Sequence, residues 1–286
     1  MLIQLLALLA LFAAQTPPKP PEPAPPEQEP AEPVKEEPAF EKLTRLTSDG
    51  VTLTADFYSL PFGMDERPVF VCFHMENGSR AEFAKIAPRL NVYACFTMAV
   101  DLRTGKATDG VANETATSAA SVLKKTAFTN EEAFADVVEA LKWARELKPK
   151  SKIFALGSGT SAALVLVAAA RDPACADAVF AFSPAEDVPG WSIAMEAKKI
   201  TVPTYVTCDG TPQEAQRARM IGNSIDKKLR KMVIPTGMQG ATRGAVVLVQ
   251  PEIALRDSHW GTVVKMILQL APTTPTPPAA PVTKDP

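Results

Sequence analysis

Histidine is scarce in this chain, and an excess of basic residues is missing. Among its 286 residues only two are histidine, and 30 lysines and arginines against 32 acidic residues leave a net charge of -2. A chain without a basic excess gains little by releasing counterions from a phosphate backbone, and no nucleic-acid-binding motif is present. We therefore expect no nucleic-acid partner.

The residue patterns of metal and phosphate sites are also missing. His74 and His259 lie far apart in the chain, and no Cys-x-x-Cys or His-Glu-x-x-His spacing occurs. The segment 157–159 lacks the lysine and the spacing of a phosphate-binding loop. We therefore expect no metal and no cofactor. The four cysteines, Cys72, Cys95, Cys175 and Cys208, do not form a disulfide framework, and both free thiols and pairing remain open.

Long apolar runs are limited to the beginning of the chain. Residues 2–14, LIQLLALLALFAA, are too few for an ordinary membrane span and have the length of a signal-peptide core. No basic residue precedes the run, and the following FAAQ is a loose match to a cleavage site. Residues 1–15 are therefore either a cleaved signal peptide or an uncleaved anchor. Both predict export to the periplasm, cell envelope or medium, with membrane contact only through an uncleaved anchor.

Proline is concentrated near the two ends. Residues 16–39 and 271–286 carry proline at short intervals, which removes backbone donors and favours extended, disordered chain. The first segment is predicted to be a linker and the second a tail. Between them, residues 40–270 are predicted to form one domain, since a chain with 46% hydrophobic residues can bury a sizeable core.

Short apolar runs alternate with helical patterns through this domain. Strands are predicted at residues 52–58, 69–74, 95–100, 153–157, 178–182, 204–208 and 231–234. Helices are predicted at residues 81–90, 130–148, 160–172, 211–229 and 258–270. Such alternation predicts an α/β fold, with a mostly parallel central sheet and helices on both faces. Ligands are then expected beyond the carboxyl ends of the strands.

Three segments at the ends of these strands carry recognisable patterns. They are FHMENGSRAEFAKIAPRL at 73–90, AVDLRTGKATDGVANET at 99–115 and VFAFSPAED at 179–187. The first is similar to the strand and histidine that supply part of an oxyanion hole, the second to an Asp-x-Arg-x-Gly stretch, and the third to a Ser-Pro turn. Together they resemble the α/β-hydrolase family, in its bacterial esterase and dienelactone-hydrolase-like branches. The resemblance covers roughly residues 48–270 and implies the α/β-hydrolase fold.

The family places its nucleophile in a Gly-x-Ser-x-Gly turn between a strand and a helix. Laid on residues 157–161, this pattern puts Gly159 where the serine is expected, and glycine has no atom that can attack a carbonyl. A register shifted by two residues would make Ser161 the nucleophile, but it requires a longer strand. Both registers remain open.

The family takes its base from a histidine in the loop after the last strand. Here the loop VIPTGMQGATRGAVVL at 233–248 has Gln239, which cannot accept a proton near neutral pH. The other candidates are His259, predicted at the start of the final helix, and His74, at the end of the oxyanion-hole strand. Glu214 and Asp209 are the candidate acids, because both follow the strand at 204–208.

A binding site can persist without this chemistry. The resemblance places His74, Met75 and Thr160 at the pocket, where backbone N–H groups near Met75 and Thr160 can hold a carbonyl oxygen or a small anion. The sequence thus predicts an exported, catalytically impaired hydrolase-like protein that binds a small acyl or carboxylate ligand.

Two alternatives remain open. One is an active serine carboxylic-ester hydrolase that uses Ser161, with His259 or His74 as the base and Glu214 as the acid. The other is a docking module of the cell envelope.

Overall fold

The computed structural model describes residues 40–61, 64–186, 188–235, 242–251 and 253–271. All of them belong to one compact unit, Pro38–Pro286. The predicted leader, linker and tail, together with Gln239, lie outside the described residues. Within the described ranges, no helix is both long and apolar enough to cross a membrane.

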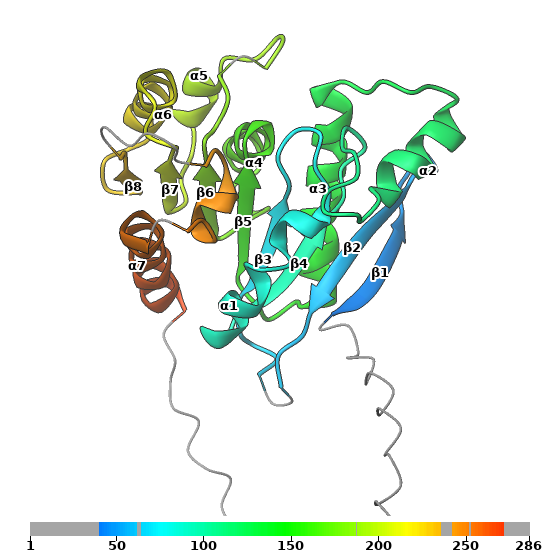
Figure 1. The fold of residues 1–286 in the computed structure, drawn as a ribbon, viewed down its shortest axis with the longest axis horizontal. Coiled ribbons are helices and arrows are strands. Elements are labelled where there is room, and N and C mark those ends of the chain that lie inside the picture. The colour runs from blue at the N-terminus through cyan, green and yellow to red at the C-terminus, as the bar shows by residue number, and fades with distance from the viewer. Residues whose placement is uncertain (1–39, 62–63, 187, 236–241, 252, 272–286) are drawn as a thin grey trace, which may run out of the picture. The chain divides into compact units, whose positions relative to one another are not determined.

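An eight-stranded sheet forms the centre of the domain (Figure 1). Its strands are β1 Glu41–Leu46, β2 Thr52–Tyr58, β3 Val69–Phe73, β4 Phe96–Val100, β5 Ile153–Ser158, β6 Ala178–Phe182, β7 Thr204–Thr207 and β8 Arg230–Val233. Their order is β1-β2-β4-β3-β5-β6-β7-β8. Strand β2 pairs antiparallel with β1 and β4, and all the other pairs are parallel. The predicted mostly parallel sheet is therefore confirmed.

Strand β1 is the one strand of this sheet that the sequence analysis does not predict. It pairs only with β2, at the edge of the sheet, and its residues are exposed or half-buried. Charged side chains such as Lys42 and Arg45 suit an edge strand because they discourage pairing with another chain. They also hide the apolar alternation that predicts a strand.

Helices cover both faces of the sheet (Figure 1). They are η1 Arg80–Phe83, α1 Ala87–Val92, α2 Glu114–Leu123, α3 Asn130–Leu147, α4 Thr160–Arg171, α5 Ile193–Ala197, α6 Pro212–Ser224, η2 Ala245–Leu248 and α7 Ile253–Leu270. One apolar core joins the sheet to α3, α4, α5 and α6, and the other joins it to η1, α1, η2 and α7.

Three predicted helices differ from the observed ones, and two observed helices, α2 and α5, were not predicted. The helix expected at 211–229 ends at Ser224. The helix expected at 81–90 is divided into η1 and α1, with Pro88 in the first turn of α1, where its fixed φ suits a new helix start. The final helix begins at Ile253, five residues before the predicted start at 258. His259 therefore lies inside α7 and not at its start.

Candidate functional site

The central feature of the site is the bend between β5 and α4. Strand β5 ends at Ser158, helix α4 begins at Thr160, and Gly159 between them has φ +61° and ψ -123°. This conformation is strained for a residue with a side chain and easy for glycine. The unshifted register, with Gly159 at the bend, is the observed one. The shifted register is wrong, since β5 does not extend far enough and Ser161 lies within α4.

Residue 157, two residues earlier, must be glycine for a separate structural reason. A Cβ at this position would lie 2.5 Å from both the Ala162 Cα and the Ser161 carbonyl oxygen. Backbone cannot move aside as the end of a side chain can, so only glycine allows α4 to pack this closely on β5. Packing therefore requires glycine at residue 157, whether or not the bend carries a nucleophile.

The side chain of Glu76 lies over the bend. A Cβ built on Gly159 would meet Glu76 Oε2 at 2.4 Å and Met75 Cγ at 2.7 Å. The same Oε2 accepts a hydrogen bond of 2.9 Å from the Thr160 backbone N–H, at the N-terminus of α4. The Glu76 carboxylate thus occupies the space of a side chain at residue 159, and it satisfies an N–H group that favours negative charge.

Arg243 holds the second oxygen of Glu76. Its Nη1 donates to Glu76 Oε1, and its Nε lies 3.3 Å from Glu214 Oε1, in the first turn of α6. Burial alone would raise the pKa of Glu76, but the Thr160 N–H and the guanidinium of Arg243 together bring that pKa below its ordinary value. For Glu214 burial prevails and raises the pKa, despite Arg243.

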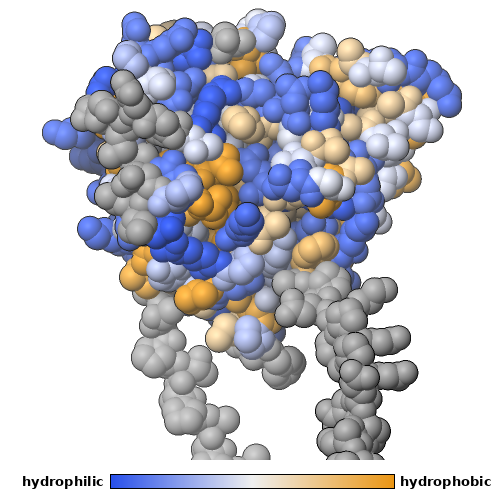
Figure 2. Space-filling view, in the orientation of Figure 1, coloured by the Kyte–Doolittle hydropathy of each residue, from blue (hydrophilic) through white to orange (hydrophobic). Residues whose placement is uncertain are grey.

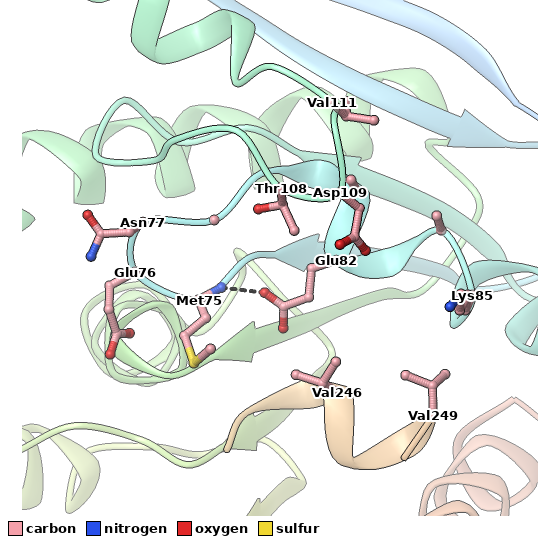
Figure 3. Close-up of a pocket in the computed structure, with 13 residues that line it drawn as sticks. Met75, Glu76, Asn77, Glu82, Lys85, Thr108, Asp109, Val111, Val246 and Val249 are labelled. Carbon is pink, nitrogen blue, oxygen red and sulfur yellow. Dashed lines mark hydrogen bonds between the residues drawn. The ribbon is translucent and has the colours of Figure 1, made fainter. Parts of the chain in front are cut away.

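Glu82, in η1, binds the other backbone donor of the site. The Met75 N–H donates to Glu82 Oε2 at 2.6 Å (Figure 3). Burial raises the pKa of Glu82, although the Ser158 hydroxyl and the Met75 N–H oppose it. Both N–H groups that the sequence assigned to anion binding, those of Met75 and Thr160, therefore donate to carboxyl groups of the chain itself.

The side chains of Ser161 and His74 form hydrogen bonds to the backbone within the fold. The Ser161 hydroxyl donates to the His74 carbonyl oxygen at 2.6 Å and is buried. The His74 imidazole accepts from the Leu102 N–H through Nε2 at 2.9 Å, so its Nδ1 donates to the Met75 carbonyl oxygen at 2.8 Å. Burial lowers the pKa of His74. Within the described residues, no hydrogen bond joins the Ser161 hydroxyl to an imidazole.

His259 lies in the apolar core between α7 and the sheet. Its Nδ1 is 2.7 Å from the Tyr205 hydroxyl and 3.3 Å from Thr207 Oγ1. The ring is fully buried, and this burial lowers the pKa of His259 to about 4. The structure thus does not bring Ser161, His259 and Glu214 together as a triad. Asp209, the other candidate acid, accepts a hydrogen bond from the Thr211 N–H in a local turn.

A cavity of about 520 Å³ opens beside the bend. It is lined by the loop after β3, η1, the loop after β4, and η2 (Figure 3). Its apolar walls come from Met75, Ala81, Val111, Val246 and Val249. Figure 2 shows an apolar area over η2, bordered by hydrophilic surface. The cavity therefore combines apolar walls with the carboxyl groups described above.

Sequence reasoning named Glu214 as a candidate acid but missed two other acidic residues and the arginine of this site. Glu76 and Glu82 stand within the segment 73–90, and Arg243 follows Gln239 by four residues, but no motif asks for them there. The signal that was available is the presence of two acids just after β3. The described part of the chain, this site included, has no cluster of three or more His, Cys, Asp or Glu residues that could hold a metal ion, and its four cysteines are free.

No protein-family model and no curated protein matches this chain. It is similar to the solved structure of a dienelactone hydrolase from Anabaena variabilis, with 15% identity and a TM-score of 0.61, over 81% of this chain and 98% of that one. A carboxyl esterase from Bacillus coagulans has 12% identity and a TM-score of 0.63, over 81% and 99%. An esterase from Thermogutta terrifontis has 14% identity and a TM-score of 0.58, over 84% and 95%. The strand order and these likenesses show that the domain has the fold of the α/β-hydrolase superfamily.

Proposed function

We propose that this protein is a hydrolase-like pseudoenzyme that binds a small molecule and does not turn over esters. The observation that carries the proposal is the carboxylate over the bend. Gly159 offers no attacking atom, and Glu76 Oε2 lies 2.4 Å from where a side chain at that residue would begin. The position of the nucleophile therefore carries no reactive atom, and the Glu76 carboxylate occupies its space.

The surrounding groups oppose acyl transfer as well. The reaction needs a base beside the nucleophile and N–H donors directed at the developing oxyanion. The N–H groups of Thr160 and Met75 donate to Glu76 and Glu82. An oxyanion at this place would meet two carboxyl groups in place of two donors. Glutamine at 239 supplies no base, whatever its position.

The alternatives receive less support. An active hydrolase would need Ser161 at the bend, but its hydroxyl is buried in α4 and bonded to the His74 carbonyl oxygen. A docking module would be favoured by one continuous apolar patch. Exposed large apolar side chains such as Leu46, Val92 and Met195 belong to the separate elements β1, α1 and α5.

The test is a search for ester hydrolysis by the purified protein. Short-chain p-nitrophenyl esters and a fluorophosphonate probe are offered to the wild type and to Ser161→Ala, with an active esterase as the positive control. We expect background turnover and no labelling in both proteins. Turnover well above background that disappears in Ser161→Ala, together with stoichiometric labelling of the wild type, would overturn the proposal.

We also propose that the protein works outside the cytoplasm. The support is the apolar run at residues 2–14 followed by the Pro-rich segment 16–39. The linker then separates the binding domain from the leader or anchor.

A further inference from the structure

Three backbone donors beside the cavity are already used. The Met75 N–H donates to Glu82, the Thr160 N–H to Glu76, and the Gly78 N–H to the Met75 carbonyl oxygen at 2.9 Å. A ligand carboxylate or carbonyl would have to displace an acceptor of the chain itself at each of these groups. The cavity therefore offers acceptors more readily than donors.

The charged side chains that line the cavity are mostly acidic, and they add further hydrogen-bond acceptors. The described lining residues include three carboxyl groups, those of Glu76, Glu82 and Asp109, and one ammonium group, that of Lys85. Lys85 and Asp109 are exposed at the rim. Arg243 does not line the cavity, because its guanidinium lies between Glu76 and Glu214.

Glu82 is the residue that most needs a partner. Figure 3 shows its carboxyl group inside the cavity, between Met75, Asp109 and Val246. Oε2 accepts from the Met75 N–H, and the Ser158 hydroxyl also favours the ionised carboxyl group, whereas Oε1 is buried and has no well-formed hydrogen bond with any described residue. A buried polar atom without a partner is costly, and a ligand that brings a donor and a positive charge would remove this cost.

We propose, building on the binding function above, that the cavity takes a protonated primary amine with a short hydrocarbon tail. An ammonium group has three donors and no acceptor, so it matches a site with carboxyl groups and few free donors. The tail packs against the apolar wall formed by Val246 of η2 and Val249, the residue that follows η2. A cavity of about 520 Å³ lies within the range of small-molecule sites. This ligand class differs from the acyl or carboxylate ligand that the sequence predicted.

Isothermal titration calorimetry with three ligands of one chain length tests the choice of charge. Hexylammonium, hexanoate and 1-hexanol are titrated into the full chain at constant ionic strength and about pH 7.5, where an alkylamine is protonated and free carboxylates are ionised. We expect hexylammonium to bind most tightly. Equal or tighter binding of hexanoate or hexanol would overturn the proposal, and so would a lack of detectable binding of hexylammonium.

Matched variants locate the binding. Glu82→Gln keeps the size of the side chain and removes its charge, and we expect it to weaken hexylammonium binding about tenfold or more. Asp109→Asn, at the exposed rim, should weaken it about threefold and serves if Glu82→Gln does not fold. Glu66→Gln is the control, because Glu66 is 75% exposed and does not line the cavity. Unchanged affinity in both cavity variants would refute the site.

The two proposals fail in different ways. Ester turnover in the wild type would remove the pseudoenzyme proposal, whatever the amine titration shows. If turnover is absent and hexylammonium does not bind, only the amine site fails.

Discussion

Adding one methyl group at Gly159 tests whether Glu76 fills the space over the bend. In Gly159→Ala the new Cβ would lie 2.4 Å from Glu76 Oε2 and 2.7 Å from Met75 Cγ. Met75 Cγ belongs to a flexible side chain that can shift. The Glu76 carboxylate can shift only by giving up its hydrogen bonds from the Thr160 N–H and Arg243.

The expected cost has two parts. A residue with a side chain at φ +61° and ψ -123° is strained by about 1–3 kcal/mol. Displacing the carboxylate loses charge-assisted hydrogen bonds, for which we take about 1–2 kcal/mol because the Glu76 side chain is 36% exposed. Gly159→Ala should therefore lower the free energy of unfolding by about 2–5 kcal/mol.

Gly190→Ala is the matched control for backbone strain alone. Gly190 has φ +80°, and a Cβ there would have no neighbour within 4 Å. We expect this variant to lose about 1–2 kcal/mol. Urea unfolding followed by tryptophan fluorescence gives the free energy of unfolding of each variant.

The comparison that decides is made in a Glu76→Ala background. There the displacement cost is absent, so Gly159→Ala should cost about 1–2 kcal/mol less than it does in the wild type. Equal costs of Gly159→Ala in the two backgrounds would refute the geometry at the bend.

Two further predictions concern Glu76 and the leader. The pKa of Glu76 lies below its ordinary value of 4.5, so the ionised carboxylate stabilises the fold above about pH 4.5, and this contribution is lost as the pH falls through the lower pKa of the folded state. Near neutral pH, the free energy of unfolding of Glu76→Gln should thus be about 1 kcal/mol lower than that of the wild type, and this difference should shrink in acid. Urea unfolding of both proteins across the pH range measures the difference. A difference that does not change with pH contradicts the prediction. If the leader is cleaved, mass spectrometry of protein from the exported fraction should find an N-terminus near residue 16, whereas an anchored chain should stay with the membrane. Full-length protein in the cytosolic fraction argues against both forms of export.

Much of the fold could be predicted because it depends on local apolar patterns. Strands β2 and β6 have the predicted bounds, and α4 starts at the predicted Thr160. The position of Gly159 at the bend was also predictable, since small residues surround it in the segment 157–161. Two predictions failed: β1 is a charged edge strand without a clear apolar alternation, and α7 begins at Ile253, before the segment 258–270 that was predicted as helix.

The occupied site could not be predicted in this way. Glu76 and Arg243 are 167 residues apart, and Glu214 comes from a third element, α6. A local pattern reports whether a residue favours a strand, a helix or a turn, and it does not report which loops meet at the end of a sheet. The sequence alone determined that residue 159 has no nucleophile. Only the tertiary structure decided that a carboxylate lies in its place, because the parallel strands bring their carboxyl-terminal loops to one edge, where distant charges pair.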